Sequence, residues 1–449
     1  MRLRASAAIV CAGLAIVAAG CGGGSKQQHS STEAPAASTT SASSSGAQTS
    51  TSSSGGNGAA AAQTANGLGF PRVATRNTTR VAGKDAVADA AGVALAVYPS
   101  AVPGTHPAVV TVAPTDDWEA ALAASVLMAP PIHAPVLLSG SGSLPVPTAN
   151  ALKLLAPTGS GSLSGAQVVL VGGVPKPSGL RAATIGGSDP YSAAAEIDRF
   201  VTAADGGRAS PDVVIASSSD PAYAMPAAGW AAESGDPILF VTPSSIPKPT
   251  IGALQAHQKP KIYVLGPPSV VSDSVLKQLG RYGTVKRISG TDPASNSVAF
   301  AVYRDPPCRF GQACVHVPGS FGWAMRGPGH GYTLLNASQP LTAAASAALS
   351  GSADYGPQLV VDDGSTLSKP VLNFFLNYAT PGYTQEGPTA AVYDHAWIIG
   401  DERVLSAAAQ AEVDELMQVI PASASNCARP SIPIASLRSI RRPSRTSVS

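Results

Sequence analysis

Short, continuous apolar runs alternate with amphipathic stretches along most of this chain of 449 residues. The alternation is clearest between residues 192 and 282. There, apolar runs predict strands at 212–216, 237–241 and 261–265, and amphipathic or alanine-rich stretches predict helices at 192–203, 222–233, 250–257 and 272–282. Fully apolar strands that are separated by helices are typical of a parallel sheet with both faces covered.

The same order of elements appears on either side of this middle segment. Before it, the pattern predicts strands at 109–112, 136–138 and 168–171 and a helix at 119–128. After it, the pattern predicts a strand at 332–335 and a last helix at 404–419. Right-handed crossovers between parallel strands then give small three-layer α/β sandwiches.

A short motif recurs three times, at 80–85 (RVAGKD), 184–189 (TIGGSD) and 287–292 (RISGTD), and its glycines are 104 and 103 residues apart. Each copy is followed by an apolar run led by proline (PVLL, PILF, PQLV) and then by an aliphatic run that ends in glycine (VLVGG, YVLG, WIIG). A period of about 100 residues suits a small domain and is too long for a solenoid unit. The sequence therefore predicts three tandem modules at 73–180, 181–283 and 284–421, the third with an insertion at 304–331.

These anchors resemble the cell wall binding repeat 2 family of bacterial surface proteins. The family pattern opens with Arg-[Ile/Val]-x-Gly-x-Asp-Arg-Tyr and continues through an Asp-Ala-Leu-Ala-Ala helix, Pro-Ile-Leu-Leu and an aliphatic strand into Gly-Gly. The match covers residues 73–419 of this chain. The resemblance implies Toprim-like or Rossmann-like modules with mainly parallel sheets, arranged as a pseudo-trimer. It also implies noncovalent attachment to an anionic polysaccharide of the cell wall.

Several charged positions of the family pattern are replaced here. The Arg that follows Gly-x-Asp is replaced by Ala86, Pro190 and Pro293, and the opening Arg of the middle copy by Thr184. The Asp that opens Asp-Ala-Leu-Ala-Ala is replaced by Ala120, Tyr223 and Thr342. The sequence therefore supports the scaffold of the modules better than it supports their ligand contacts.

Residues 1–20 have the features of a secretory signal, because Arg2 and Arg4 precede an apolar stretch that is too short to span a bilayer. The segment Ala18-Ala19-Gly20-Cys21 resembles the lipobox of bacterial lipoproteins, with Ala18 at a position that is usually Leu. This resemblance implies a lipid on Cys21; ordinary signal cleavage is the alternative. Residues 21–72 are rich in Ser, Gly and Thr and predict a disordered tether, because they hold too few apolar side chains to form a core.

The composition limits the classes of partner that this protein is expected to bind. Only 12% of the residues are charged and the formal net charge is +2, so no nucleic-acid surface is implied. The sequence has no second apolar run of about 18 residues, so the expected membrane attachment is the lipid alone. The tail at 422–449 is basic and rich in Pro and Ser. We expect it to be solvated, with contact to an anionic polymer or lipid head groups as the alternative.

Two cysteines lie close together in the insertion, at Cys308 and Cys314. Outside the cytoplasm a local disulfide between them is expected. A metal-binding pair is the alternative, although no further Cys or His with ligand spacing lies nearby. Cys427 is then left as a free thiol in the tail. We expect no metal and no cofactor.

The motif aspartates stand just before the first helix of each module, at Asp85, Asp189 and Asp292. A carboxylate at this place caps a helix; contact with a ligand is the alternative. The glycines that follow predicted strands are Gly172, Gly173, Gly266 and Gly400. Glycine permits a tight turn there, but this edge is also where open α/β sheets bind ligands, and the sequence leaves both roles open.

No motif for catalysis is present. The sequence has no His-Glu-x-x-His spacing and no Gly-x-Ser-x-Gly nucleophile elbow. The acid pairs at 116–117 and 362–363 follow strands in loop-like sequence and are expected to be solvated. The glycine-rich stretch at 159–165 precedes a strand, so a plain turn is expected instead of a dinucleotide-binding loop. The sequence gives no support for an enzyme.

We therefore expect an extracytoplasmic, lipid-anchored protein that binds a cell-wall glycan noncovalently through three modules. The candidate contacts are Arg80, Asp85, Arg181, Asp189, Lys286, Arg287 and Asp292. The alternatives are an enzyme or small-ligand receptor on the same sheets, with the insertion as a lid, and a scaffold that binds another protein. The sequence leaves open the identity of the glycan and the oligomeric state.

Overall fold

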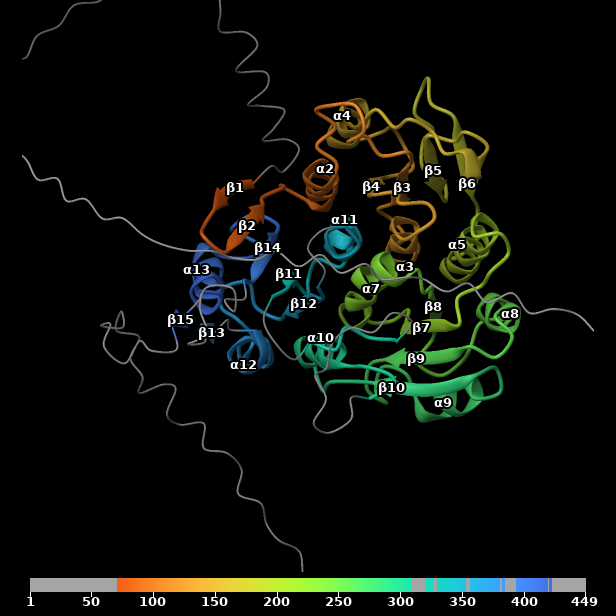
Figure 1. Ribbon diagram of the computed structural model, residues 1–449. Helices are drawn as coiled ribbons and strands as arrows, with labels where there is room; N and C mark the ends of the chain where they lie inside the picture. The colour runs from red at the N-terminus through yellow and green to blue at the C-terminus, as the bar shows by residue number, and fades with distance from the viewer. Residues whose placement is uncertain are drawn as a thin grey trace, which may run out of the picture. The chain divides into compact units, whose positions relative to one another are not determined.

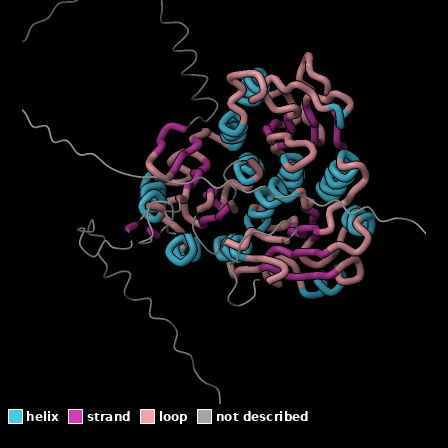
Figure 2. The backbone as a smooth tube through the Cα atoms, in the orientation of Figure 1, coloured by secondary structure: helices cyan, strands magenta, loops and turns pink. Residues whose placement is uncertain are grey.

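The computed structural model describes residues 71–307, 320–325, 329–352, 356–379, 382–383, 393–418 and 420–421. The predicted signal, most of the tether, the cysteine loop at 308–314 and the basic tail lie outside the described residues. In the described part, three sheets of mainly parallel strands each form their own group with helices beside them (Figures 1 and 2). This confirms the predicted α/β class and its three modules.

Each sheet has the same strand order. The first sheet runs β4-β3-β5-β6 and consists of β3 (Val110–Pro114), β4 (Val136–Ser139), β5 (Val168–Val171) and β6 (Ala182–Ile185). The second runs β8-β7-β9-β10 and consists of β7 (Asp212–Ser217), β8 (Ile238–Val241), β9 (Lys261–Leu265) and β10 (Thr284–Ile288). The third runs β12-β11-β14-β2 and consists of β11 (Gly331–Asn336), β12 (Gln358–Val361), β14 (His395–Ile399) and β2 (Thr78–Val81). Strand β1 (Pro71–Ala74) adds to β2 in antiparallel orientation, and β13 (Gly382–Tyr383) pairs with β15 (Ile420–Pro421).

Each helix that the sequence predicts by range is present, although the predicted helix at 119–128 is divided into α3 and the 3-10 helix η1 and two others also differ. They are α2 (Ala86–Val97), α3 (Trp118–Ala123), η1 (Ala124–Met128), α4 (Val146–Leu155), η2 (Gly161–Leu163), α5 (Pro190–Ala204), α6 (Pro221–Ala224), α7 (Pro226–Ser234), α8 (Lys248–Ala256), α9 (Asp273–Leu279), α10 (Pro293–Val302), α11 (Leu341–Ser350), α12 (Lys369–Phe374), η3 (Phe375–Ala379) and α13 (Ala407–Leu416). The predicted helix at 222–233 is divided into α6 and α7, since Pro226 has no N–H to continue the first helix. The last helix is shorter than predicted because Ser406 caps its start, accepting a hydrogen bond from the Ala409 N–H.

Fully apolar strands are buried on both faces. In β5, Val169 and Val171 belong to the large core that spans the modules, whereas Val168 and Leu170 belong to a second, smaller core on the opposite face of the sheet. All four residues are buried. Burying a Val or Leu side chain stabilises a fold by about 1.5–3 kcal/mol, so each residue of such a strand contributes and none alternates toward water.

The motif strand of each repeat completes the sheet of the repeat before it. Strand β6, which ends with Thr184 and Ile185 of the second motif copy, pairs in parallel with β5 of the first sheet. Strand β10 pairs in the same way with β9 of the second sheet. The sequence boundaries after residues 180 and 283 therefore fall between the last two strands of a sheet.

The helix that follows each motif strand covers the next sheet. Helix α2 packs against β4 and α4, α5 packs against β8 and α8, and α10 packs against β12 and α12. We call each unit of outer strand, turn and helix a link; the links span residues 78–97, 182–204 and 284–302. Because one link belongs to two sheets, neighbouring modules share a continuous structural unit.

The first link joins the two ends of the described chain. Strand β2 pairs in parallel with β14 of the third sheet, so an orange strand lies beside a blue one in Figure 1. The Asn77 N–H donates to Asp414 Oδ1 at 2.8 Å, and its side-chain amide donates to the Asp414 carbonyl at 3.0 Å. The third sheet is therefore completed by a strand from the beginning of the described chain.

Every link turn requires glycine. The turn passes so close to the following helix that an ideal Cβ on Gly83 would lie 2.5 Å from Asp89 Oδ1. The same atom on Gly187 would lie 2.5 Å from Ala193 Cα, and on Gly290 it would lie 2.2 Å from the Asn296 nitrogen. The recurring glycine of the motif is thus explained by close backbone packing between the turn and the helix.

Small side chains let the alanine-rich helices of the three modules meet. Helix α7 packs against both η1 and α11, and α11 also packs against α3. Residues 342–350 of α11 are all buried. Where α7 meets the third module, the Gly229 N–H donates to Gln358 Oε1 at 3.0 Å. The interior between the sheets is therefore built from close helix contacts with few large side chains.

The described ends of the insertion are anchored on the second sheet. The Phe321 ring stacks on Tyr263 with 3.4 Å between ring centroids, and Trp323 meets Trp230 edge-on at 5.2 Å. The Tyr263 hydroxyl also donates to Asp305 Oδ2 at 2.6 Å. These buried aromatic contacts make the two ends part of the large core.

We expect Gly290→Ala to lower the free energy of unfolding by about 1–3 kcal/mol, since the added methyl group forces the turn away from α10. Gly186→Ala is the matched control: it lies in the corresponding turn of the second link, one position before the motif glycine, its Cβ would meet nothing within 4 Å, and Ala82 already occupies the equivalent position in the first link. Urea unfolding of both variants measures the difference. Equal stability of the two variants would show that the close packing of the turn does not matter.

Candidate functional site

The motif aspartates cap the link helices. Asp85 Oδ1 accepts from the Ala88 N–H at 2.9 Å, and Asp292 Oδ1 accepts from the Ser295 N–H at 2.7 Å. Asp189 accepts from two backbone N–H groups and forms a capping box with Ser192. Burial acts to raise the pKa of Asp189, but the hydrogen bonds from Ser192 outweigh it and hold the pKa below its usual value. The capping role accounts for all three carboxylates.

The residue six positions after the motif glycine differs between links. In the first link the Gly83 N–H donates to Asp89 Oδ1 at 2.8 Å, and in the third the Gly290 N–H donates to Asn296 Oδ1 at 3.2 Å. Asp89 is 1% exposed. Burial raises its pKa to about 8, against the lowering effect of the Gly83 hydrogen bond. Asp89 therefore binds a proton in the folded protein near neutral pH.

Two of the predicted glycan contacts are internal clamps. Arg80 is 2% exposed and donates to Gln410 Oε1 and to the carbonyls of Gly400 and Ser406. Arg287 donates to the carbonyls of Gly266 and Val271 at 2.7 and 2.8 Å and pairs with Asp273. In both cases the guanidinium joins a link strand to the loop that follows the neighbouring strand.

The strand-end glycines make a common turn next to these clamps. Gly172, Gly266 and Gly400 have φ values of 69°, 104° and 101°, which favour glycine. Their N–H groups donate to the carbonyls of Ile185, Ile288 and Val81 at 2.9, 3.0 and 2.9 Å. Each turn thus fastens a sheet to its link strand, and Gly173 lies exposed beside the first of them.

Lys286 is held by the insertion. Its Nζ atom lies 2.6 Å from Asp305 Oδ1, and its side chain is 41% exposed. The same carboxylate group accepts a hydrogen bond from the Tyr263 hydroxyl. This lysine therefore neutralises a carboxylate of the protein itself, which leaves Arg181 as the one predicted cationic contact that is exposed and has no ion pair with the described residues.

Arg181 lines a groove along the outer edge of the first sheet. The groove has a volume of about 600 Å³ and lies between β6, η2 and α5. Lys176 supplies a second cation, and Phe200 supplies an aromatic ring from α5. Neither cation forms an ion pair within the described part of the chain. The groove therefore combines positive charge, hydroxyl groups and one ring.

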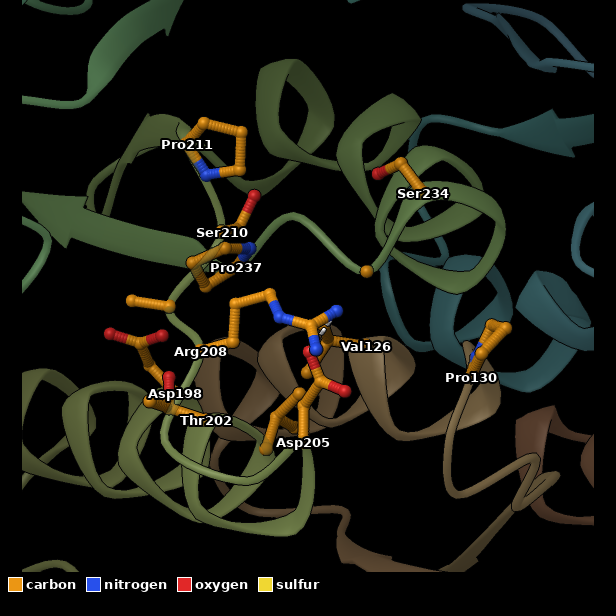
Figure 3. Close-up of a pocket in the computed structure, with 13 residues that line it drawn as sticks. Val126, Pro130, Asp198, Thr202, Asp205, Arg208, Ser210, Pro211, Ser234 and Pro237 are labelled. Carbon is orange, nitrogen blue, oxygen red and sulfur yellow. Dashed lines mark ion pairs between the residues drawn. The ribbon is translucent and has the colours of Figure 1, made fainter. Parts of the chain in front are cut away.

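A smaller pocket of about 200 Å³ lies where the first and second modules meet (Figure 3). Val126 and Pro130 of the first module face the end of α5 and the turn after it. Arg208 points toward Asp205 and forms an ion pair with it at 3.7 Å. The charges at the mouth of this pocket are thus paired with each other.

A buried network with a histidine forms one wall of this pocket. His257 Nε2 lies 2.8 Å from Asp198 Oδ2, and Nδ1 lies 2.7 Å from the Ser210 carbonyl. Burial lowers the pKa of His257, but the hydrogen bond and charge of Asp198 outweigh it and raise the pKa above its ordinary value. The Ser210 hydroxyl donates to Asp236 instead of to the histidine. Both ring nitrogens therefore face acceptors, and the ring is not placed to activate a nucleophile.

The acid pairs have local roles. Asp117 Oδ1 caps α3 by accepting from the Ala120 N–H at 2.8 Å, and Asp363 accepts from the Ser365 N–H at 2.8 Å. Among the residues that the structure describes, no group of three or more His, Cys, Asp and Glu side chains is arranged to hold a metal ion. Nor does this part of the chain contain a helix with the length and hydrophobicity needed to cross a bilayer.

A family model for cell wall binding domain 2 (CWB2) matches residues 184–276. These residues are thus similar to a CWB2 domain. The match confirms the resemblance for the middle repeat. A search of curated proteins finds no match.

The solved structures of Cwp6 and Cwp8 from Clostridium difficile are similar in fold. Cwp6 has 15% sequence identity and a TM-score of 0.55 over 74% of this chain and 47% of its own. Cwp8 has 16% identity and a TM-score of 0.57 over 76% of this chain and 52% of its own. The present chain thus spans about half the length of each.

The CWB2 match begins in β6 and ends in α9. It therefore contains most of the second link and three strands of the second sheet, but not β10, which completes that sheet. The matched residues are therefore similar to a domain that is described as cell wall binding. Lys176 and Arg181 lie just before them.

Sequence patterns did not identify Lys176 and Phe200, which come from a loop and from the amphipathic helix of the second link. No spacing rule connects them with Arg181, because only the pairing of β6 with β5 and the position of α5 bring them to one groove. The predicted lipid site Cys21 and the predicted disulfide between Cys308 and Cys314 lie outside the described residues.

We expect Asp89→Asn to raise the free energy of unfolding near neutral pH by at least about 1 kcal/mol, since each pKa unit corresponds to about 1.4 kcal/mol. The unfolded carboxyl ionises near its ordinary pKa of 3.8 and the folded one near 8, so the wild-type protein loses stability as pH rises between these values. Asparagine keeps the acceptor for Gly83 and has no charge to bury.

Asn296→Asp is the matched reverse change in the third link, and we expect it to lower stability increasingly as pH rises. Urea unfolding of both variants and the wild-type protein from acidic to weakly alkaline pH measures these differences. Stability curves that run parallel for Asp89→Asn and the wild-type protein would contradict the raised pKa of Asp89.

Proposed function

We propose that this protein attaches noncovalently to a glycan of the bacterial cell envelope while a lipid on Cys21 holds it at the membrane. The observation that carries the proposal is the CWB2 match at residues 184–276, in a chain whose three links repeat the same geometry. The CWB2 match supports binding to the cell wall in general. The glycan and the lipid are our extension of it.

A glycan is the wall component that fits the surface best. The exposed cations Lys176 and Arg181 form no ion pair with described carboxylates. Of the other predicted cationic contacts, Arg80 and Arg287 donate to backbone carbonyls and Lys286 is paired with Asp305. Polysaccharides of cell envelopes present repeated hydroxyl groups and, in many cases, phosphate or carboxylate groups. Guanidinium and ammonium groups recognise such anions through charge-assisted hydrogen bonds.

Membrane attachment is supported by the order of segments at the beginning of the chain. A positive segment and an apolar stretch precede small residues and Cys21, and a polar stretch rich in Ser and Gly follows. The predicted tether at 21–72 would reach on the order of 40 Å if it behaved as a random coil. Such a length would hold the modules away from the membrane surface and within reach of wall polymers.

We expect the mature protein to sediment with purified cell walls and to be released as salt rises from about 0.05 M to about 0.5 M, because exposed charges are then screened. Walls from which the secondary polymers have been removed serve as the comparison and should retain much less protein. The bound fraction is measured on gels. The absence of binding to either preparation at low salt would refute the proposed function.

We expect Cys21→Ser to move the protein from the membrane fraction to the soluble or secreted fraction, because the acylated thiol is lost. Cys427→Ser is the matched control, since it removes a cysteine from the tail and leaves the proposed lipid site intact. Cell fractionation and incorporation of a labelled fatty acid measure the change. If both variants remain in the membrane fraction with the label, the lipid is not on Cys21.

A further inference from the structure

The groove beside β6 differs from the equivalent edges of the other two sheets. Ile185, Ile288 and Val81 occupy equivalent positions, since each accepts the hydrogen bond of a strand-end glycine. Two positions before these residues, Ala183 in the first sheet corresponds to Lys286 in the second sheet and to Thr79 in the third. The outer edge of β2 is also covered by β1. The first sheet therefore has the smallest side chains at a position where the other two have larger ones.

The small side chains leave space that other elements enclose. Ala182 and Ala183 line the groove from the strand, and Ala203 and Ala204 line it from α5. The volume of about 600 Å³ lies within the range of about 300–1,000 Å³ that is usual for ligand sites. An open groove of this kind suits a segment of a polymer that continues beyond the site on both sides.

Arg181 is held in place at one wall of the groove. Its guanidinium lies against Gly165, where an ideal Cβ would be 2.9 Å from Cζ. The backbone N–H of Arg181 donates to Gln167 Oε1 at 3.2 Å, and the backbone carbonyl of Arg181 accepts from the Gln167 N–H at 2.8 Å. The base of this side chain is therefore fixed by the backbone while its charge stays exposed to the groove.

The remaining lining adds complementary chemistry. Ser162 and Ser164 bring hydroxyl groups, and Lys176 brings a second positive charge. Phe200 is partly buried against the core and also lines the groove. The face of an aromatic ring carries partial negative charge and attracts polarised C–H groups, which sugar rings present on one side. Cations, hydroxyl groups and a ring together match an anionic sugar chain.

We propose that this groove, formed by β6, η2 and α5, binds a segment of an anionic polysaccharide, with Arg181 and Lys176 contacting its acidic groups and Phe200 packing against a sugar ring. This inference rests on the proposed attachment to a wall glycan and assigns that attachment to one site. Phosphate and carboxylate share the chemistry that both cations recognise. The experiment therefore uses one polymer of each kind.

The test compares the mature protein with two double variants that lose the same charge. Lys176→Gln with Arg181→Gln removes both groove cations. Lys277→Gln with Arg281→Gln removes two exposed cations near the end of α9, away from the groove lining. Binding is measured by titration against a poly(glycerol phosphate), a polygalacturonate and neutral dextran over a range of salt concentrations, and circular dichroism checks the fold.

The affinity of the groove variant for the acidic polymer that the wild-type protein binds should fall at least about tenfold. The salt dependence of its binding should correspond to about two fewer ionic contacts. The control variant should change by less than about threefold. A third variant, Phe200→Leu, should weaken binding without changing the salt dependence. The polymer that binds more tightly identifies phosphate or carboxylate as the preferred group.

Different failures are distinguishable. If the wild-type protein binds walls but the groove variant binds them equally well, the site is wrong and the proposed function remains. Equal losses in the two double variants, or equal binding of dextran, would also overturn the groove as a specific site for an acidic polymer. Competition by an extended peptide, but not by either acidic polymer, would instead identify the edge of β6 as a site for strand addition.

Discussion

Each sheet of this protein lacks its outer strand until a neighbouring repeat supplies it. An outer strand contributes a row of backbone hydrogen bonds, and without β10 the edge of β9 would expose unpaired N–H and C=O groups. The matched CWB2 segment begins in β6, which pairs outside the segment, and lacks β10, which completes its own sheet. The unit that the family model describes is therefore complete only when its neighbours are present. This constraint makes the repeats one cooperative structure.

The links show which parts of the motif are needed for this sharing. Glycine is kept in all three because the turn lies against the helix, and Asp is kept because it caps that helix. Arg is kept in the first and third links, where it clamps a link strand to the neighbouring loop. Thr184 replaces it in the second link, so the clamp is dispensable at that position. The requirements of folding therefore explain why the motif recurs three times within this chain.

The sequence predicted the strands, helices and repeats well because buried parallel strands produce continuous apolar runs and links produce a fixed motif. It did not predict that each motif strand joins the preceding sheet, because a local pattern does not specify a distant pairing partner. The candidate contacts were predicted less well for a related reason. Arg80 and Arg287 have the same charge as Arg181 in the sequence, and only the fold shows that two guanidinium groups point to backbone carbonyls while the third faces a groove.

These differences bear on how three repeats would hold a polymer. Three equivalent sites on one molecule would multiply the affinity of each through a high effective concentration. Here the equivalent positions are Ala183, Lys286 and Thr79, and Lys286 is already paired with Asp305. The first sheet combines an open groove with two exposed cations that form no ion pair with described residues. Under the proposed function, each molecule would therefore bind the polymer once, and avidity would require several lipid-anchored molecules side by side on the same polymer.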